Sequence, residues 1–108
     1  MQRLRLEYVD MYIMHFMTPD IDPNTLEVKR DSLMDVWREL EKCQKEGLTR
    51  SIGVSNCTTV ILMEILSFCE IKPASNQVEL HPYLTLELVH EFHHKMGIPL
   101  EALSPLNP

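Results

Sequence analysis

The sequence predicts an α/β fold: a parallel (β/α)₈ TIM barrel, present here as a partial barrel of about four strands and three helices. Four short apolar runs alternate with three segments of helical periodicity, and such alternation gives right-handed crossovers and a parallel sheet. The chain has 108 residues, whereas a closed barrel needs about 250. Since a parallel sheet with helices on one side only leaves an apolar face bare, we expect a piece of a barrel.

The first predicted strand runs from Tyr8 to His15, is mostly apolar and ends in a histidine. The segment 16–30 that follows contains Pro19 and Pro23 and is predicted to be a loop. It is longer than the usual connection of about 2–6 residues between a strand and a helix. Long loops after the carboxyl end of a strand commonly carry binding residues, so the region after His15 is a candidate binding element.

Two helices are expected on either side of the central strand. The first begins at Asp31 or Ser32, where Ser32 and Asp35 resemble a capping box, and Gly47 ends it. Thr58 or Thr59 caps the second. The apolar stripes at helical spacing are Leu33, Val36, Trp37 and Leu40 in the first helix, and Ile61, Leu62, Ile65, Leu66 and Cys69 in the second.

The central strand, Ser51 to Asn56, contains β-branched residues and has a helical pattern on each side, as buried parallel strands do. Gly53 lacks a Cβ, so another group can approach this strand closely. Ser55 and Asn56 stand at the carboxyl end, where α/β folds bind ligands. These two side chains either hydrogen-bond a ligand or belong to a turn that caps the next helix, and both interpretations stay open at this point.

A third strand is predicted over Ala74 to Glu79 and a fourth over Ile98 to Leu103. The third helix lies between them, from about Thr85 to Met96, and Gly97 stops it. Its predicted apolar stripe comprises Leu88, Val89, Phe92 and Met96.

Composition excludes several classes of protein. A formal charge of −6 argues against binding to nucleic acid, and no apolar run approaches the ~20 residues of a membrane span. Three cysteines without a C-x-x-C pair indicate reduced thiols, so we expect a cytoplasmic location. Cys57 precedes a helix, whose N-terminus can lower a thiol pKa, but a plain buried cysteine is the favoured interpretation.

One motif suggests a different class of enzyme. His90, Glu91 and His94 satisfy the H-E-x-x-H pattern of zinc peptidases. The metzincin pattern would need a third histidine where Leu100 stands. Helical periodicity also turns both histidines away from the apolar stripe and into solvent, so this zinc site is a minor alternative and we expect no metal.

Four motifs, taken together, resemble the aldo-keto reductases, which are (β/α)₈ barrel enzymes that reduce carbonyls with NADPH. They appear in the family's order and spacing, nearly end to end, as strands 4 to 7 of the eight. The motifs are Asp10–His15, Gly47–Leu48 followed by Ile52–Asn56, Asn76–Tyr83, and Gly97–Ile98 ahead of Ala102–Leu106.

The resemblance implies which residues bind the NADP(H) cofactor. Ser55, Asn56 and Gln77 would hydrogen-bond the nicotinamide carboxamide and so decide which face of the ring is presented. Ser104 and Leu106 would meet the ribose or pyrophosphate. Hydroxyl and amide groups supply the donors and acceptors that a carboxamide needs.

The resemblance also implies which residues contact the substrate. His15 would be the catalytic histidine that orients or polarises the substrate carbonyl, and Phe16 would line the substrate pocket. The family's catalytic tetrad further needs an aspartate, a tyrosine and a lysine, all expected upstream of Met1. Leu103 stands where the family usually has an aromatic residue that stacks on the nicotinamide.

These observations predict that residues 1–108 form a partial domain of an NADP-dependent aldo-keto reductase, which reduces aldehydes or ketones to alcohols. We expect the chain alone to be inactive and to self-associate through exposed strand edges. Its expected partner is a small-molecule carbonyl substrate, with no nucleic acid and no membrane. The alternative is a catalytically silent relative that binds a nucleotide or a protein partner.

Overall fold

A computed structural model of the chain describes residues 2–15, 20–21, 24–25, 28–29 and 32–106. Its main sheet has four parallel strands, and every strand pairs with the next one in the sequence order β1-β4-β5-β6. The strands are β1 (Val9–Met14), β4 (Thr49–Ser55), β5 (Asn76–Glu79) and β6 (Leu100–Leu103). The helices are α1 (Leu33–Lys45), α2 (Thr59–Phe68) and α3 (Glu87–Met96). The predicted alternation and parallel pairing are confirmed.

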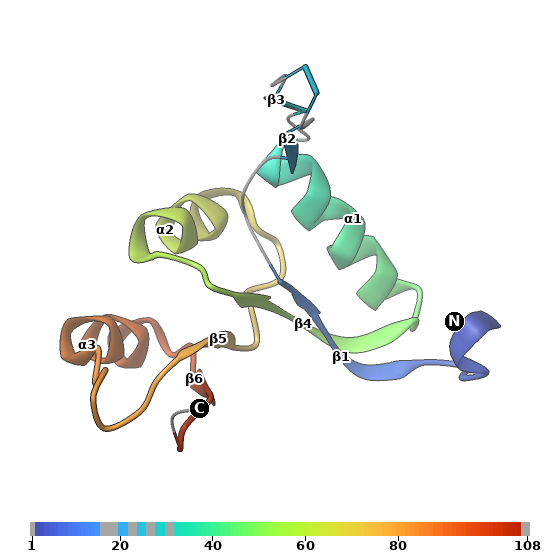
Figure 1. Cartoon of the computed structure of the whole chain (residues 1–108). Helices are drawn as coiled ribbons and strands as arrows, with labels where there is room; N and C mark the ends of the chain where they lie inside the picture. The colour runs from blue at the N-terminus through green and yellow to red at the C-terminus, as the bar shows by residue number, and fades with distance from the viewer. Residues whose placement is uncertain (1, 16–19, 22–23, 26–27, 30–31, 107–108) are drawn as a thin grey trace.

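The three helices form an arc along one side of the strands (Figure 1). A short 3₁₀ helix, Gln2–Leu4, precedes β1. The prediction of an unbroken loop over 16–30 is wrong, because β2 (Asp20–Ile21) and β3 (Val28–Lys29) pair there as an antiparallel hairpin. Strands of two residues are too short to show an alternating pattern in the sequence. No helix in the part of the chain that the structure describes is long and apolar enough to cross a membrane.

The apolar core lies between the sheet and the first two helices. The fully buried apolar side chains among the described residues are Trp37, Ile52, Val54, Leu62, Ile65 and, just before β6, Ile98. This set confirms the predicted stripes of α1 and α2 and the buried central strand. Burial of each such side chain contributes roughly 1.5–3 kcal/mol to folding.

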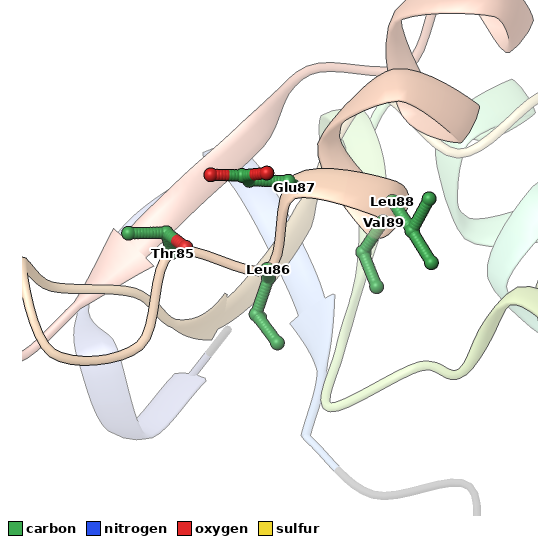
Figure 2. A pocket seen from close by; sticks show the side chains of 5 residues that line it. All are labelled: Thr85, Leu86, Glu87, Leu88 and Val89. Atoms are coloured by element: carbon green, nitrogen blue, oxygen red, sulfur yellow. The ribbon is translucent and has the colours of Figure 1, made fainter.

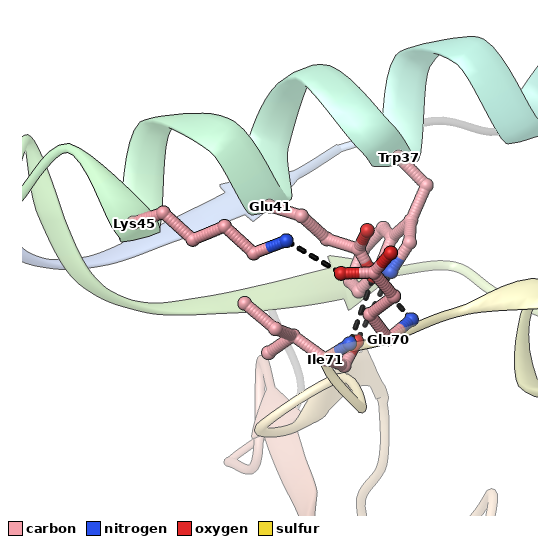
Figure 3. A network of polar contacts seen from close by, with 5 residues as sticks. All are labelled: Trp37, Glu41, Lys45, Glu70 and Ile71. Atoms are coloured by element: carbon pink, nitrogen blue, oxygen red, sulfur yellow. Dashed lines mark hydrogen bonds and ion pairs between the residues drawn. The ribbon is translucent and has the colours of Figure 1, made fainter.

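A buried polar contact ties α1 to the turn that follows α2 (Figure 3). Glu41 is only 3% exposed, and its Oε1 accepts hydrogen bonds from the backbone N–H groups of Glu70 at 2.7 Å and Ile71 at 2.8 Å. The indole Nε1 of Trp37 donates to the carbonyl of Ile71 at 3.1 Å. These bonds satisfy backbone groups where the chain leaves α2 and turns toward β5.

The helix ends confirm some predictions and correct one. Thr58 caps α2, since its side chain accepts a hydrogen bond from the N–H of Ile61 at 3.3 Å. Gly47 follows α1 with a left-handed φ of 76°, as expected of the residue after a helix. The predicted capping box at Ser32 is wrong: its side chain makes no capping bond, and only its carbonyl accepts from the N–H of Val36.

Helix α3 presents a different face from the predicted one. Leu88 is 82% exposed, so its assignment to the apolar stripe is wrong. Val89, Phe92 and Met96 are half-buried, as the stripe requires, and His93 takes the fully buried place. A histidine can lie there because both of its ring nitrogens have hydrogen-bond partners.

Candidate functional site

Four predicted site residues gather at the carboxyl ends of three neighbouring strands. His15 directly follows β1, Ser55 ends β4 and Asn56 follows it. Gln77, in β5, lies beside Ser55 in the register of the parallel pair. Their predicted convergence at one end of the sheet is confirmed.

Hydrogen bonds centred on Asn56 join these strand ends. Its side-chain Nδ2 donates to the backbone carbonyl of His15 at 3.2 Å and to Ser55 Oγ at 3.3 Å. Ser55 Oγ in turn donates to the backbone carbonyl of Gln77 at 2.9 Å. Asn56 has a left-handed φ of 52°, which asparagine adopts more readily than most residues. The turn after β4 therefore points a polar side chain across the ends of β1 and β4.

The side chain of Gln77 has a partner that sequence reasoning missed. Its Nε2 donates to Oε2 of Glu101, on β6, at 3.4 Å. Gln77 and Glu101 are neighbours in the parallel register and both are half-buried. The only sequence signal was a lone carboxylate inside an otherwise apolar predicted strand.

A second set of polar groups lies behind the turn, on the helix side of the sheet. The side-chain Oδ1 of Asn76 accepts from the backbone N–H of Cys57 at 3.3 Å, and its Nδ2 donates to the carbonyl of Cys57 at 2.8 Å. Nδ2 also lies 3.0 Å from Nε2 of His93. Asn76 and His93 are both fully buried. Sequence reasoning assigned neither residue a part in the site.

Burial raises the pKa of the Cys57 thiol to about 12. This confirms the favoured prediction of a plain buried cysteine. The suggestion that the start of α2 lowers its pKa is wrong, because burial disfavours the charged thiolate.

The remaining predicted site residues lie at the edge of this region. Ser104 follows β6 with a left-handed φ of 52°, and both it and Leu106 are exposed. Leu103, at the end of β6, is also exposed. Phe16 lies outside the described residues. The predicted close approach at Gly53 is confirmed, since an added Cβ would lie 3.1 Å from Ser75 Oγ.

Other surfaces offer little to a metal or a small molecule. His90 and His94 are exposed, as predicted, and among the described residues no three His, Cys, Asp or Glu side chains group closely enough to hold a metal. An open hollow surrounds the start of α3, and every residue that lines it comes from one short segment (Figure 2). None of these is a predicted site residue. The lining residues are Thr85, Leu86, Glu87, Leu88 and Val89.

Comparisons with known proteins agree with one another. A model of the Aldo/keto reductase family matches residues 1–108. D-galacturonate reductase of Fragaria ananassa is 42% identical over 98% of this chain and 35% of that protein. Glyoxal reductase of Bacillus subtilis is 43% identical over 98% of this chain and 34% of that protein. The solved Bombyx mori aldo-keto reductase in complex with NADP matches with a TM-score of 0.84 at 30% identity, over 95% of this chain and 33% of that chain.

The match in structure confirms the predicted fold class, a partial (β/α)₈ barrel. This chain spans about a third of the length of the curated relatives that it matches. The individual roles of His15, Ser55, Asn56 and Gln77 stay predictions.

Proposed function

The chain belongs to the aldo/keto reductase family over residues 1–108, and from this premise we propose that it carries part of an NADP(H)-dependent site that reduces an aldehyde or ketone to an alcohol. The observation behind the proposal is the gathering of His15, Ser55, Asn56 and Gln77 at the carboxyl ends of β1, β4 and β5. In barrel enzymes these ends form the active site.

The residues present fit a nicotinamide carboxamide. The carboxamide has an NH₂ donor and a carbonyl acceptor, and the amides of Asn56 and Gln77 each have both kinds of group. Asn56 Nδ2 already donates to Ser55 Oγ and to the backbone carbonyl of His15, so its Oδ1 is the atom proposed to accept a hydrogen bond from the carboxamide NH₂. When bound, NADPH supplies the hydride. The side chains hold the ring so that one face meets the substrate.

His15 is proposed to act on the substrate. It is exposed and directly follows β1, next to the turn that carries Asn56. A neutral imidazole can donate a hydrogen bond to a carbonyl oxygen as negative charge develops there, which lowers the energy of the transition state. By the family resemblance, it is the one tetrad member in this sequence.

We therefore propose that these 108 residues alone do not turn over a carbonyl substrate. General acid catalysis contributes roughly 10²–10⁴-fold and needs a donor held within hydrogen-bond reach of the carbonyl oxygen. The assay is NADPH oxidation with 4-nitrobenzaldehyde, comparing the chain with His15→Ala. We expect no oxidation above background from either. Turnover that the substitution abolishes would contradict the proposal of inactivity.

The binding part of the proposal has its own experiment. Nicotinamide mononucleotide is titrated into the ¹⁵N-labelled chain while the side-chain amide signals of Asn56 and Gln77 are followed by NMR. We expect both to shift, together with the backbone signal of Ser55. Adenosine 2′,5′-bisphosphate is the control ligand, because it lacks the carboxamide, and should leave them in place. Shifts confined to residues of α3 would argue against a carboxamide site.

The proposed self-association rests on the outer strands of the sheet. β1 and β6 each have one strand neighbour in the main sheet. Exposed apolar side chains accompany them, among them Met11, Tyr12 and Leu103. Unpaired strand edges and apolar surface favour association. Sedimentation velocity should show dimers or larger species whose fraction grows with concentration. A compact monomer at all concentrations would contradict this.

A further inference from the structure

The side-chain amide of Asn76, which is fully buried, makes three hydrogen bonds. Its Oδ1 accepts from the backbone N–H of Cys57 at 3.3 Å, and its Nδ2 donates to the carbonyl of Cys57 at 2.8 Å. The second Nδ2 proton points to Nε2 of His93, 3.0 Å away. One side chain thus satisfies both backbone groups of the residue that follows Asn56.

The partners of His93 determine which ring nitrogen carries the proton. Nδ1 lies 2.8 Å from the backbone carbonyl of Val89, which can only accept, so Nδ1 carries the hydrogen. Nε2 is then unprotonated and accepts from Asn76. The alternative tautomer would set two donors against each other at Asn76 and two acceptors at Val89. Only one neutral form of His93 satisfies both contacts.

We propose that His93 is a positioning residue that holds the turn 55–57 in place through Asn76. The chain of contacts runs from α3, through the imidazole and the amide, to the backbone of Cys57, and so fixes the direction in which Asn56 leaves β4. The consequence for a carboxamide ligand rests on the proposed function. The effect on the turn does not.

A purely space-filling role for His93 predicts something different. If the ring only fills volume, an apolar residue of similar size would serve, and any loss would appear as a uniform loss of stability. If the ring orients Asn76, its removal leaves a buried N–H without a partner. The amide can then rotate, and the loosening appears first at Cys57.

Hydrogen exchange at two backbone amides separates these possibilities. The N–H of Cys57 is bonded to Asn76, whereas the N–H of Val54, inside β4, is bonded to the carbonyl of Ser75 and reports on the sheet. In His93→Leu we expect exchange at Cys57 to accelerate about tenfold more than at Val54, the size of one lost hydrogen bond. Equal acceleration at both amides would overturn the proposal.

Two further variants complete the comparison. His93→Gln can present its amide oxygen close to the position of Nε2, so it should keep the protection of Cys57 near that of the unsubstituted chain. His94→Leu removes an exposed histidine from the same helix and should change neither amide. If hydrogen exchange at the Cys57 amide accelerates as much in His93→Gln as in His93→Leu, the acceptor at Nε2 has no positioning role and the proposal fails.

A direct reading of the tautomer does not depend on any variant folding well. In the ¹⁵N-histidine-labelled chain, long-range ¹H–¹⁵N spectra should show a protonated Nδ1 and an unprotonated Nε2 for His93. A protonated Nε2 would overturn the proposal. Nicotinamide mononucleotide is then added. If it shifts neither Asn56 nor Gln77 in the unsubstituted chain, the proposed function fails, while the exchange and tautomer results still decide the role of His93.

Discussion

Two buried polar side chains fasten turns at different places around the same sheet. Glu41, on α1, accepts two backbone N–H groups from the turn that leads into β5, at Glu70 and Ile71. Asn76, on β5, accepts one backbone group and donates to another in the turn that leaves β4, both at Cys57. The first turn joins a helix to the start of a strand. The second lies at a strand's carboxyl end, beside the candidate site.

The difference in chemistry matches the difference in position. A carboxylate can only accept, so Glu41 fixes a turn in which two neighbouring N–H groups need an acceptor. The exposed pair of Lys45 and Glu70 lies just outside this contact (Figure 3). An amide can both accept and donate, so Asn76 bonds the backbone N–H and the backbone carbonyl of the same residue, Cys57. In barrels, residues at the amino ends of strands mainly serve stability and those at the carboxyl ends serve function.

The largest expected effect follows removal of the charged contact. Glu41→Leu sets an apolar side chain against the backbone N–H groups of Glu70 and Ile71 in place of their buried acceptor, and should lower the free energy of unfolding by about 3 kcal/mol. Urea denaturation measures this loss. Glu39→Leu changes an exposed carboxylate on the same helix and should cost far less. Equal losses from the two substitutions would contradict the assigned role of Glu41.

A smaller global effect and a larger local one are expected at the other turn. Asn76→Asp keeps an acceptor for the N–H of Cys57 but loses the donors to its carbonyl and to His93, so it should cost about 2 kcal/mol. Hydrogen exchange should rise more at Cys57 than at Val54. A uniform rise would mean that Asn76 supports the sheet as a whole rather than this turn.

The smallest of the three effects depends on pH. Burial raises the pKa of Cys57 to about 12, so the folded state holds this proton more tightly than the unfolded state does. The stability that Cys57 contributes is therefore lost as the pH rises above the pKa of its thiol in the unfolded chain, about 8.5. The free energy of unfolding should fall by about 1 kcal/mol between pH 8 and 9.5 for this reason. Urea denaturation of the unsubstituted chain and of Cys57→Ala at both pH values isolates the pH-dependent contribution of Cys57 to the free energy of unfolding. No difference between their pH slopes would contradict it.

The periodic parts of the fold could be predicted from the sequence. The stripes of α1 and α2 each contain buried residues such as Trp37 and Leu62, and the β-branched run of β4 is buried. At α3 the same reasoning failed, because hydrophobicity ranks Leu88 above His93. The hydrogen bond to Asn76 that makes burial of His93 favourable joins residues far apart in the sequence.

In the candidate site, too, local sequence pattern revealed some residues, whereas contacts between distant segments stayed hidden. Ser55 and Asn56 could be found because a strand visibly ends in polar residues, and the family resemblance added His15 and Gln77. Glu101 remained hidden, since its contact with Gln77 exists only through the pairing of β5 with β6. The motifs therefore pointed to the residues that we propose face the ligand, whereas the groups that hold them in place required the structure.

The most direct test of the central claim compares the affinity of nicotinamide mononucleotide for three chains: the unsubstituted chain, Gln77→Leu and Glu41→Gln. Gln77→Leu removes a proposed ligand group at the carboxyl end of the strands. Glu41→Gln keeps an acceptor in the turn before β5, outside the site. We predict that Gln77→Leu weakens binding by about tenfold or more, the value of a lost hydrogen bond in a protected site, and that Glu41→Gln leaves the dissociation constant unchanged. Equal affinity of Gln77→Leu and the unsubstituted chain would contradict the account.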